Sequence, residues 1–231
     1  MYVLKIENVS KYINDEKILS NISLKISNNT IFGLVGCNGA GKSTLLKMVL
    51  GIYSTNSGEI YIDNHSVKKE VEEALKNVGA VVDSPNLYNY LSGKRNLEFF
   101  NLLGKNLSKR KLYEVVKLLK MESYIDKPVS TYSLGMRQRL ALGIALISYP
   151  KLLILDEPIN GLDPIGIKEL RNILVYLKKK YNMAIIISSH ILSELENICD
   201  KVAIIKDHKI HKIIEIKKGE KNLENIFFEE S

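Results

Sequence analysis

The chain of 231 residues has no tryptophan and only two cysteines, Cys37 and Cys199. Two thiols in a chain of this length do not make the disulfide framework that stabilises small secreted domains. We therefore expect both cysteines to be free thiols in a reducing compartment. The remaining composition, with 45% hydrophobic and 26% charged residues, is ordinary for a soluble globular protein with a buried core.

The sequence also lacks any long apolar run. The longest candidates, such as Leu152–Leu155 and Ala184–Ile187, have the length of buried strands, whereas a membrane-spanning helix needs about 20 apolar residues. The first residues, Met1–Glu7, lack the basic region, apolar stretch and cleavage site of a signal peptide. These absences predict a cytoplasmic protein without a membrane span of its own.

The formal net charge of +7 and the pI of about 9.1 suggest nucleic acid or an anionic membrane surface as partners. The excess is mostly lysine spread along the chain, however, and no basic stripe alternates with aromatic residues. We therefore predict no nucleic-acid partner. Arginine occurs only as Arg95, Arg110, Arg137, Arg139 and Arg171.

Hydrophobic periodicity predicts strands that alternate with helices. The predicted strands are Val3–Glu7, Ile22–Ile26, Ile31–Val35, Glu59–Asp63, Leu152–Leu155, Ala184–Ser188, Val202–Ile205 and Lys209–Ile216. The predicted helices are Lys42–Leu50, Lys109–Met121 with Ser108 as its N-cap, Ile167–Lys180 and Ile191–Ile198. This order predicts an α/β core with a partly parallel sheet, into which a helical block from Tyr88 to Ser148 is inserted. We expect one domain over residues 1–231, with its core in 1–87 and 149–231.

The sharpest signal is the run from Gly36 to Thr44, which fits the pattern G-x-x-x-x-G-K-[ST] between a predicted buried strand and a predicted helix. Its glycines let backbone N–H groups converge on an anion, and the helix N-terminus adds a partial positive charge. We expect Lys42 to bind the β- and γ-phosphates of ATP and the Ser43 hydroxyl to hold Mg²⁺. The predicted nucleotide-binding residues of this loop are Gly36, Asn38, Gly39, Ala40, Gly41, Lys42, Ser43 and Thr44.

Two carboxylates, Asp156 and Glu157, follow the apolar strand Leu152–Leu155. A strand inside a parallel sheet delivers its C-terminal residues to the edge where ligands bind. Asp156 is predicted to bind Mg²⁺, and Glu157 to act as general base on the water that attacks the γ-phosphate. A capping or turn role would explain an isolated acid pair equally well, but the phosphate loop favours the catalytic interpretation.

Further motifs narrow the family. The run Ser133–Arg139 resembles the signature of ABC ATPases, Asn160–Pro164 resembles their D-loop, and His190 ends a strand as their switch histidine does. Tyr12 lies where the family places an aromatic residue against adenine. Because these elements occur in the family's order, almost the whole chain resembles an ABC ATPase nucleotide-binding domain. The resemblance implies a P-loop NTPase fold with a mixed sheet core, an N-terminal antiparallel β region and an inserted helical subdomain.

The resemblance also implies roles and partners. Tyr12 would stack on adenine, and His190 would contact the γ-phosphate as a catalytic residue beside Lys42 and Glu157. The start of the signature helix would contact the ATP of a second protomer through Ser133 and Gly135, so that a homodimer, or a dimer with a related chain, encloses two ATP molecules. Since no span is predicted, the transport pathway must lie in a separate transmembrane permease that holds the chain at the inner face of the membrane.

The signature departs from the family's usual pattern at two positions. Leu134 stands where glycine is usual and Met136 where glutamine is usual, whereas Ser133 and Gly135 remain. Since the two phosphate-contacting residues are kept, we expect the contact with the partner's ATP to survive.

A further departure lies in the segment Val78–Pro85. Asp83 stands where most members carry a glutamine that contacts Mg²⁺ and couples to the permease. An acidic residue here resembles the bacitracin-resistance and lantibiotic-immunity branch, which generally has glutamate. The tail Asn222–Phe227 resembles the ending of that branch. We therefore predict an exporter of antimicrobial peptides, with Asp83 as a metal-contacting residue.

Three other interpretations compete with a peptide exporter. An ABC ATPase acting on DNA would carry a long coiled coil between the phosphate loop and the signature, for which the roughly 90 residues between Ser43 and Ser133 leave no room. Ribosome-acting members usually carry two ATPase domains, whereas we predict one here. A transporter for another cargo would use the same motor. An inactive regulatory module is disfavoured because four residues are intact, namely Lys42, Asp156, Glu157 and His190.

Overall fold

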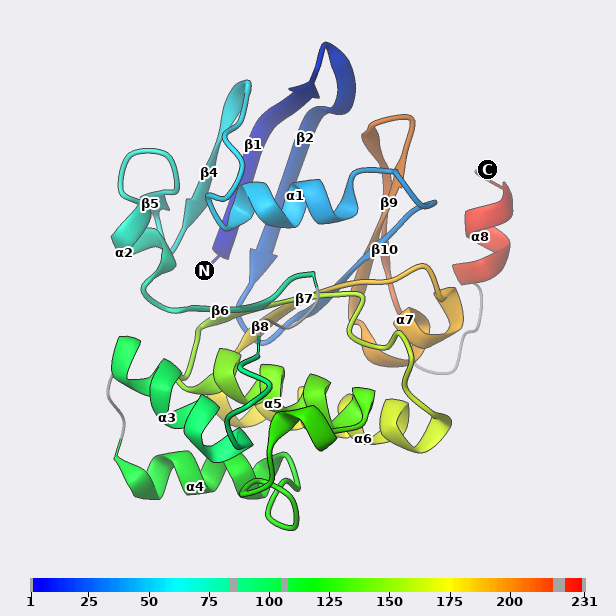
Figure 1. Cartoon of the computed structure of the whole chain (residues 1–231). Coiled ribbons are helices and arrows are strands. Elements are labelled where there is room, and N and C mark those ends of the chain that lie inside the picture. Colours follow the sequence, from blue (N-terminus) through cyan, green and yellow to red (C-terminus); the bar gives the residue numbers. More distant parts are fainter. Residues whose placement is uncertain (1, 84–86, 105–107, 218–222, 230–231) are drawn as a thin grey trace.

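The computed structural model describes residues 2–83, 87–104, 108–217 and 223–229. These residues form two sheets with helices between and below them (Figure 1). Ser84 and Pro85 of the predicted coupling segment and Asn222 of the predicted tail lie outside the described residues. None of the described helices is long and apolar enough to cross a membrane.

The N-terminal residues form an antiparallel sheet, as expected, in the order β2-β1-β4-β5. Its strands are β1 (Tyr2–Ile13), β2 (Glu16–Ser27), β4 (Ser57–Ile62) and β5 (His65–Ser66). The predictions Val3–Glu7 and Ile22–Ile26 were too short. Both strands continue through irregularities in the pairing register to a tight turn at Asn14 and Asp15, whose φ angles are positive. Asparagine and aspartate tolerate this backbone conformation, which hairpin turns require.

The second sheet has the order β10-β9-β3-β8-β7-β6 and is parallel except for β10, which pairs antiparallel with β9. The five parallel strands bring their C-terminal ends to one edge of the sheet. This arrangement confirms the prediction of a mixed α/β core. The strands are β3 (Ile31–Val35), β6 (Val78–Val81), β7 (Leu152–Asp156), β8 (Ala184–Ser188), β9 (Lys201–Lys206) and β10 (Lys209–Glu215).

Alternate residues of the central strands serve two separate cores. In β7, Leu152 and Ile154 point toward the cluster that includes α1 and the antiparallel sheet, whereas Leu153 and Leu155 point toward the helices on the opposite face. All four side chains are at most 1% exposed. Burial on both faces explains why these strands have continuous apolar sequences.

The helices cover both faces of this sheet. In Figure 1, α1 lies between the two sheets and α5 and α6 lie on the other side of the large sheet. The helices are α1 (Lys42–Val49), α2 (Val71–Leu75), α3 (Gly93–Leu103), α4 (Lys109–Leu118), α5 (Leu134–Leu146), α6 (Pro164–Tyr181), α7 (Leu192–Ile198) and α8 (Leu223–Glu229), with a 3₁₀ turn at Val129–Thr131.

Each of the four predicted helices differs from its prediction by one to three residues at one or both ends, and α1 ends at Val49 and α6 at Tyr181, one residue from the predicted ends. The helix predicted to reach Met121 ends at Leu118, because Lys120 has a positive φ of 54° that a helix cannot contain. The helix predicted from Ile167 begins at Pro164, because the Asp163 side chain accepts a hydrogen bond from the third residue of α6. The helix predicted from Ile191 begins one residue later.

Candidate nucleotide-binding site

The loop between β3 and α1 surrounds a buried lysine. Gly41 has φ 93°, a left-handed conformation that glycine adopts without strain, and α1 starts at the next residue. The side chain of Lys42 is 6% exposed, and its Nζ donates hydrogen bonds to the backbone oxygens of Gly36 (2.8 Å) and Cys37 (3.3 Å). The tip of the loop at Asn38 and Gly39 is exposed. A solvent-accessible loop thus surrounds a positive charge, as anion binding requires.

Close packing explains the first glycine of the loop. A Cβ atom on Gly36 would lie 2.6 Å from the backbone oxygen of Ile205 in β9, so no larger residue fits there. Ala40 and Thr44 are partly buried, and Ser43 is the second residue of α1. The predicted phosphate-binding residues therefore lie together at the C-terminal edge of the sheet.

The three predicted catalytic side chains meet at this edge. Lys42 Nζ lies 3.9 Å from Glu157 Oε1, and His190 Nδ1 lies 3.0 Å from Glu157 Oε2. They come from α1 and from the ends of β7 and β8, which are neighbouring parallel strands with Asp156 opposite Ser188. Glu157 has φ 48°, an uncommon conformation for a residue with a side chain. The sheet register thus brings a cation, a carboxylate and an imidazole into one cluster.

Ser188, to which the sequence motifs assign no role, binds both members of the acid pair. Ser188 is fully buried, and its hydroxyl donates a hydrogen bond to Asp156 Oδ1. The Ser188 hydroxyl oxygen itself accepts a hydrogen bond from the backbone N–H of Glu157 at 2.8 Å. A polar residue at the end of the apolar strand Ala184–Ile187 was the signal that could have identified it. Ser188 therefore fixes the direction of the Asp156 side chain and the position of the Glu157 backbone.

The donor atoms at this edge suit magnesium. The Asp156 carboxylate and the Ser43 hydroxyl are hard oxygen donors, which Mg²⁺ prefers. Among the described residues, no group of three or more histidine, cysteine, aspartate or glutamate side chains could hold a metal ion. A metal at Asp156 would therefore depend on the oxygens of a bound nucleotide, as is usual for Mg²⁺ in phosphoryl-transfer sites.

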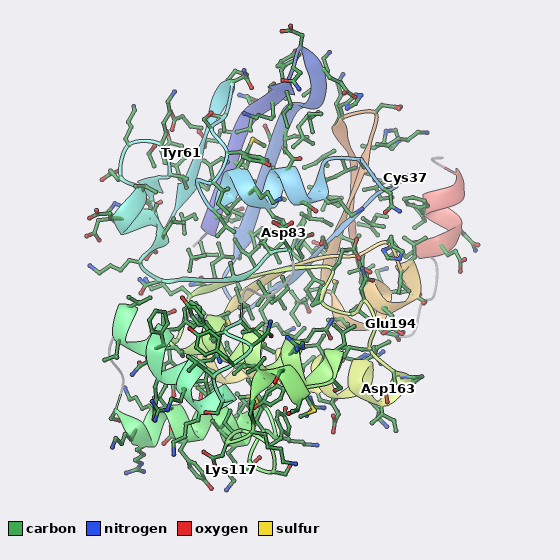
Figure 2. All side chains as sticks on the ribbon, in the orientation of Figure 1. Cys37, Tyr61, Asp83, Lys117, Asp163 and Glu194 are labelled. Atoms are coloured by element: carbon green, nitrogen blue, oxygen red, sulfur yellow. The ribbon has the colours of Figure 1, made fainter. Side chains whose placement is uncertain are left out.

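Asp83 follows β6 at the same sheet edge but makes a different contact. Its Oδ2 lies 2.9 Å from Nζ of Lys47 in α1, and its side chain is 62% exposed. In Figure 2, Asp83 is labelled below α1. The hydrogen bond to Asp83 raises the pKa of Lys47 above its ordinary value. The predicted metal contact of Asp83 stays a prediction.

The signature and the D-loop are in contact within the protomer. Ser133 is the N-cap of α5 and accepts a hydrogen bond from the Met136 N–H at 3.3 Å. Gln138 Nε2 donates to the backbone oxygen of Asn160 at 2.7 Å. A Cβ on Gly161 would lie 2.3 Å from Leu134 Cδ2, so the leucine of the unusual signature packs over the D-loop glycine.

The remaining predicted contacts lie apart from the catalytic cluster. The α5 helix that starts at Ser133 and Gly135 lies on the face of the sheet opposite α1, which suits the prediction that these two residues serve the nucleotide of a second protomer. Tyr12 lies near the end of β1, and its side chain is 42% exposed. Its backbone N–H donates a hydrogen bond to Asn56 Oδ1 at 2.9 Å. Its stacking on adenine stays a prediction.

A family model described as ABC transporter matches residues 19–160, which is more than half of the chain. The chain is 45% identical over 215 residues to the uncharacterized ABC transporter ATP-binding protein YhcH of Bacillus subtilis (strain 168), covering 93% of this chain and 70% of that protein. It is 40% identical over 227 residues to the lantibiotic transport ATP-binding protein SrtF of Streptococcus pyogenes, covering 97% and 96%. The bacitracin transport ATP-binding protein BcrA of Bacillus licheniformis is 39% identical over 208 residues, covering 90% and 68%.

The fold leads to the same family. The solved structure of cbiO1 from Clostridium perfringens, part of the ABC transporter complex cbiONQ, superposes with a TM-score of 0.83 at 29% sequence identity, covering 99% of this chain and 92% of that chain. The phosphate loop, the acid pair and the histidine occupy one edge of this fold. The chain belongs to the ABC transporter family and is one of its ATP-binding, ATP-hydrolysing subunits.

Proposed function

We propose that this subunit is the motor of a membrane exporter of antimicrobial peptides, and that it hydrolyses ATP at the cluster of Lys42, Glu157 and His190. The observation that carries the catalytic assignment is the contact of Glu157 with both a lysine and a histidine. Glu157 would accept the proton of the attacking water as general base, and Lys42 would bind the β- and γ-phosphates. His190 would contact the γ-phosphate and hold Glu157 in place.

Mg²⁺ would be held by Ser43 and Asp156 together with phosphate oxygens. The metal, when bound, neutralises charge that develops on the phosphates. Ser188 keeps the Asp156 side chain directed to this place, because its hydroxyl donates to one carboxylate oxygen and leaves the other available.

Two protomers would close over two ATP molecules. In each of the two sites, the loop at Lys42 of one protomer would hold the phosphates of ATP. The N-terminus of α5 of the other protomer, at Ser133 and Gly135, would contact the same ATP. Hydrolysis would release the dimer, and this change between two states would drive a separate transmembrane permease. The helical block Tyr88–Ser148, close to Asp83, is the proposed docking surface, and the permease would hold the subunit at the membrane.

Similarity to relatives supports the peptide cargo. SrtF is a lantibiotic transport protein and BcrA a bacitracin transport protein, and both are about 40% identical to this chain. The acidic residue Asp83 in place of the usual glutamine supports the same branch. The residues that bind the peptide would lie in the permease. This chain would supply the energy of transport through ATP hydrolysis, and the permease would select the cargo.

Affinity purification from detergent-solubilised membranes of the native host, followed by mass spectrometry, tests the transporter. We expect a polytopic membrane protein in stoichiometric amounts, also with a Lys42→Ala variant, which loses ATP binding but keeps the docking surface. Ribosomal proteins or DNA-bound partners without a permease would overturn the proposal.

The peptide cargo needs a test of its own. A host strain lacking the subunit should become sensitive to bacitracin or to a lantibiotic, and the intact gene should restore resistance. A Glu157→Gln copy should not restore it. Unchanged sensitivity to both classes of peptide would reject this cargo, even if a permease co-purifies.

A further inference from the structure

An ion pair connects the helix of the phosphate loop with the residue that replaces the family's glutamine. Lys47 lies in α1, one helical turn after Ser43, and its Nζ is 2.9 Å from Asp83 Oδ2. Asp83 follows the neighbouring β6 and is 36 residues away in sequence. The two groups therefore join the nucleotide loop to the segment that precedes the helical block.

The surroundings of Lys47 hold its side chain toward Asp83. Its side chain is only 20% exposed, and its Nζ lies 5.7 Å from the centre of the Tyr53 ring. Besides Asp83, the groups that act on its charge are Tyr53 and Asp156, and each of them favours the ammonium form. Lys47 is thus a cation held beside Asp83, with Asp156 at the end of β7 also acting on its charge.

The chemistry of the pair favours a carboxylate at position 83. A glutamine would offer Lys47 only a neutral amide oxygen, whereas aspartate gives a charge-assisted hydrogen bond, which is roughly twice as strong. Asp83 also has φ 60°, a conformation that aspartate tolerates better than most residues. The short side chain and the backbone conformation together suit a partner on α1.

We propose that Lys47 is the positioning residue for Asp83, and that their ion pair, rather than Asp83 alone, couples the phosphate loop to the permease. This inference rests on the proposed function, because coupling needs a permease. The pair occupies one oxygen of Asp83, so a metal contact through that oxygen requires the pair to break. A displacement of α1 when nucleotide binds is then transmitted directly to Asp83.

A double-mutant cycle on the complete complex tests the inference. The variants are Lys47→Met, Asp83→Asn, the double variant, and Lys47→Arg as the control that keeps the cation. The measured quantity is the stimulation factor, which is the ATPase turnover of the subunit with its permease in vesicles divided by that of the isolated subunit. Dividing by the isolated rate removes any change that acts on hydrolysis itself.

We expect each single neutral variant to lower the stimulation factor about 3- to 10-fold. The double variant should lose no more than the worse single variant, since both changes remove the same pair, and Lys47→Arg should stay within about 2-fold of the original chain. A double variant whose loss equals the product of the two single losses overturns the inference, as does normal stimulation of Lys47→Met.

The failure of the proposed function gives a separate result. If the original chain shows no stimulation by any co-purified membrane protein, the exporter proposal fails. The same cycle is then measured as the KM for Mg–ATP of the isolated subunit. Non-additive changes there still support Lys47 as the positioning residue of Asp83, and additive changes reject it.

Discussion

Single hydroxyl and carboxylate groups decide the chemistry at the residue scale. We expect Ser188→Ala to lower kcat about 10-fold, because it removes the donor to Asp156 and the acceptor for the Glu157 N–H, at a cost of about 1–3 kcal/mol. Steady-state ATPase assays measure this. The neighbouring Ser189 is equally buried but binds the backbone of Ile191, so Ser189→Ala is the matched control. Equal losses in both variants would mean that only strand packing is disturbed.

The exposed thiol of Cys37 gives a second test at this scale. We expect alkylation of Cys37 to abolish hydrolysis, because the added group occupies the tip of the phosphate loop, and we expect bound ATP to protect the thiol. Peptide mapping and ATPase assays over time measure both effects. Cys199 should stay unmodified in the folded protein, since burial raises the pKa of its thiol.

A variant without the thiol separates the two cysteines. The ATPase rate of Cys37→Ser should be the same before and after the alkylating reagent is added. Undiminished hydrolysis after complete modification of Cys37 in the original chain would contradict the assigned position of the phosphates.

At the scale of elements, ion pairs connect the helical block to α6. Glu169 in α6 accepts hydrogen bonds from Lys120 at 2.8 Å and from Arg139 in α5. These two cations, Lys120 first, lower the pKa of Glu169 below its ordinary value of 4.5. The carboxylate therefore stabilises the folded state above the ordinary glutamate pKa, and this contribution is lost as the pH falls through the lowered pKa.

We accordingly expect Glu169→Gln to reduce the free energy of unfolding by about 1 kcal/mol at pH 7, or about 2–4 °C in Tm. The difference from the original chain should shrink below about pH 4.5 and vanish once Glu169 is protonated in the folded state. Thermal unfolding followed by circular dichroism between pH 3 and 7 measures it. Glu114→Gln removes a much more exposed pair with Arg110 and should have little effect. A pH-independent difference for Glu169→Gln would exclude the ion-pair explanation.

The strands that could be predicted are those in which an uninterrupted run of apolar residues indicates burial. Ile31–Val35 and Ala184–Ser188 were predicted to the residue because both of their faces are buried. The strand β6 was missed because Gly79 and Ala80 interrupt its apolar pattern. A Cβ on Gly79 would lie 2.2 Å from the backbone oxygen of Ala145, so the small residue is required by the close approach of α5, which only the fold reveals.

The same distinction applies to the site, where some features lie in consecutive residues and others are contacts between residues far apart in the sequence. The phosphate loop and the acid pair could be predicted because the residues of each are consecutive. The contacts of Ser188 with Asp156 and of Lys47 with Asp83 join residues 32 and 36 positions apart, so no local pattern contains them. They follow from the order of the parallel strands, which sequence periodicity does not give.

At the scale of the whole molecule, the proposed function needs a second copy to complete each nucleotide site. Lys42, Glu157 and His190 lie at the sheet edge, whereas the N-terminus of α5 belongs to the opposite face of the sheet. We therefore predict that ATP brings two protomers together and that hydrolysis separates them.

The most direct test is the oligomeric state and turnover of Glu157→Gln in the presence of ATP. We predict a dimer with two bound ATP molecules by light scattering and nucleotide analysis, with turnover about 10²- to 10⁴-fold below the original chain. With ADP the same variant should be monomeric. Hydrolysis at the original rate would contradict the role of Glu157 as general base, and a monomer with ATP bound would contradict the closed dimer.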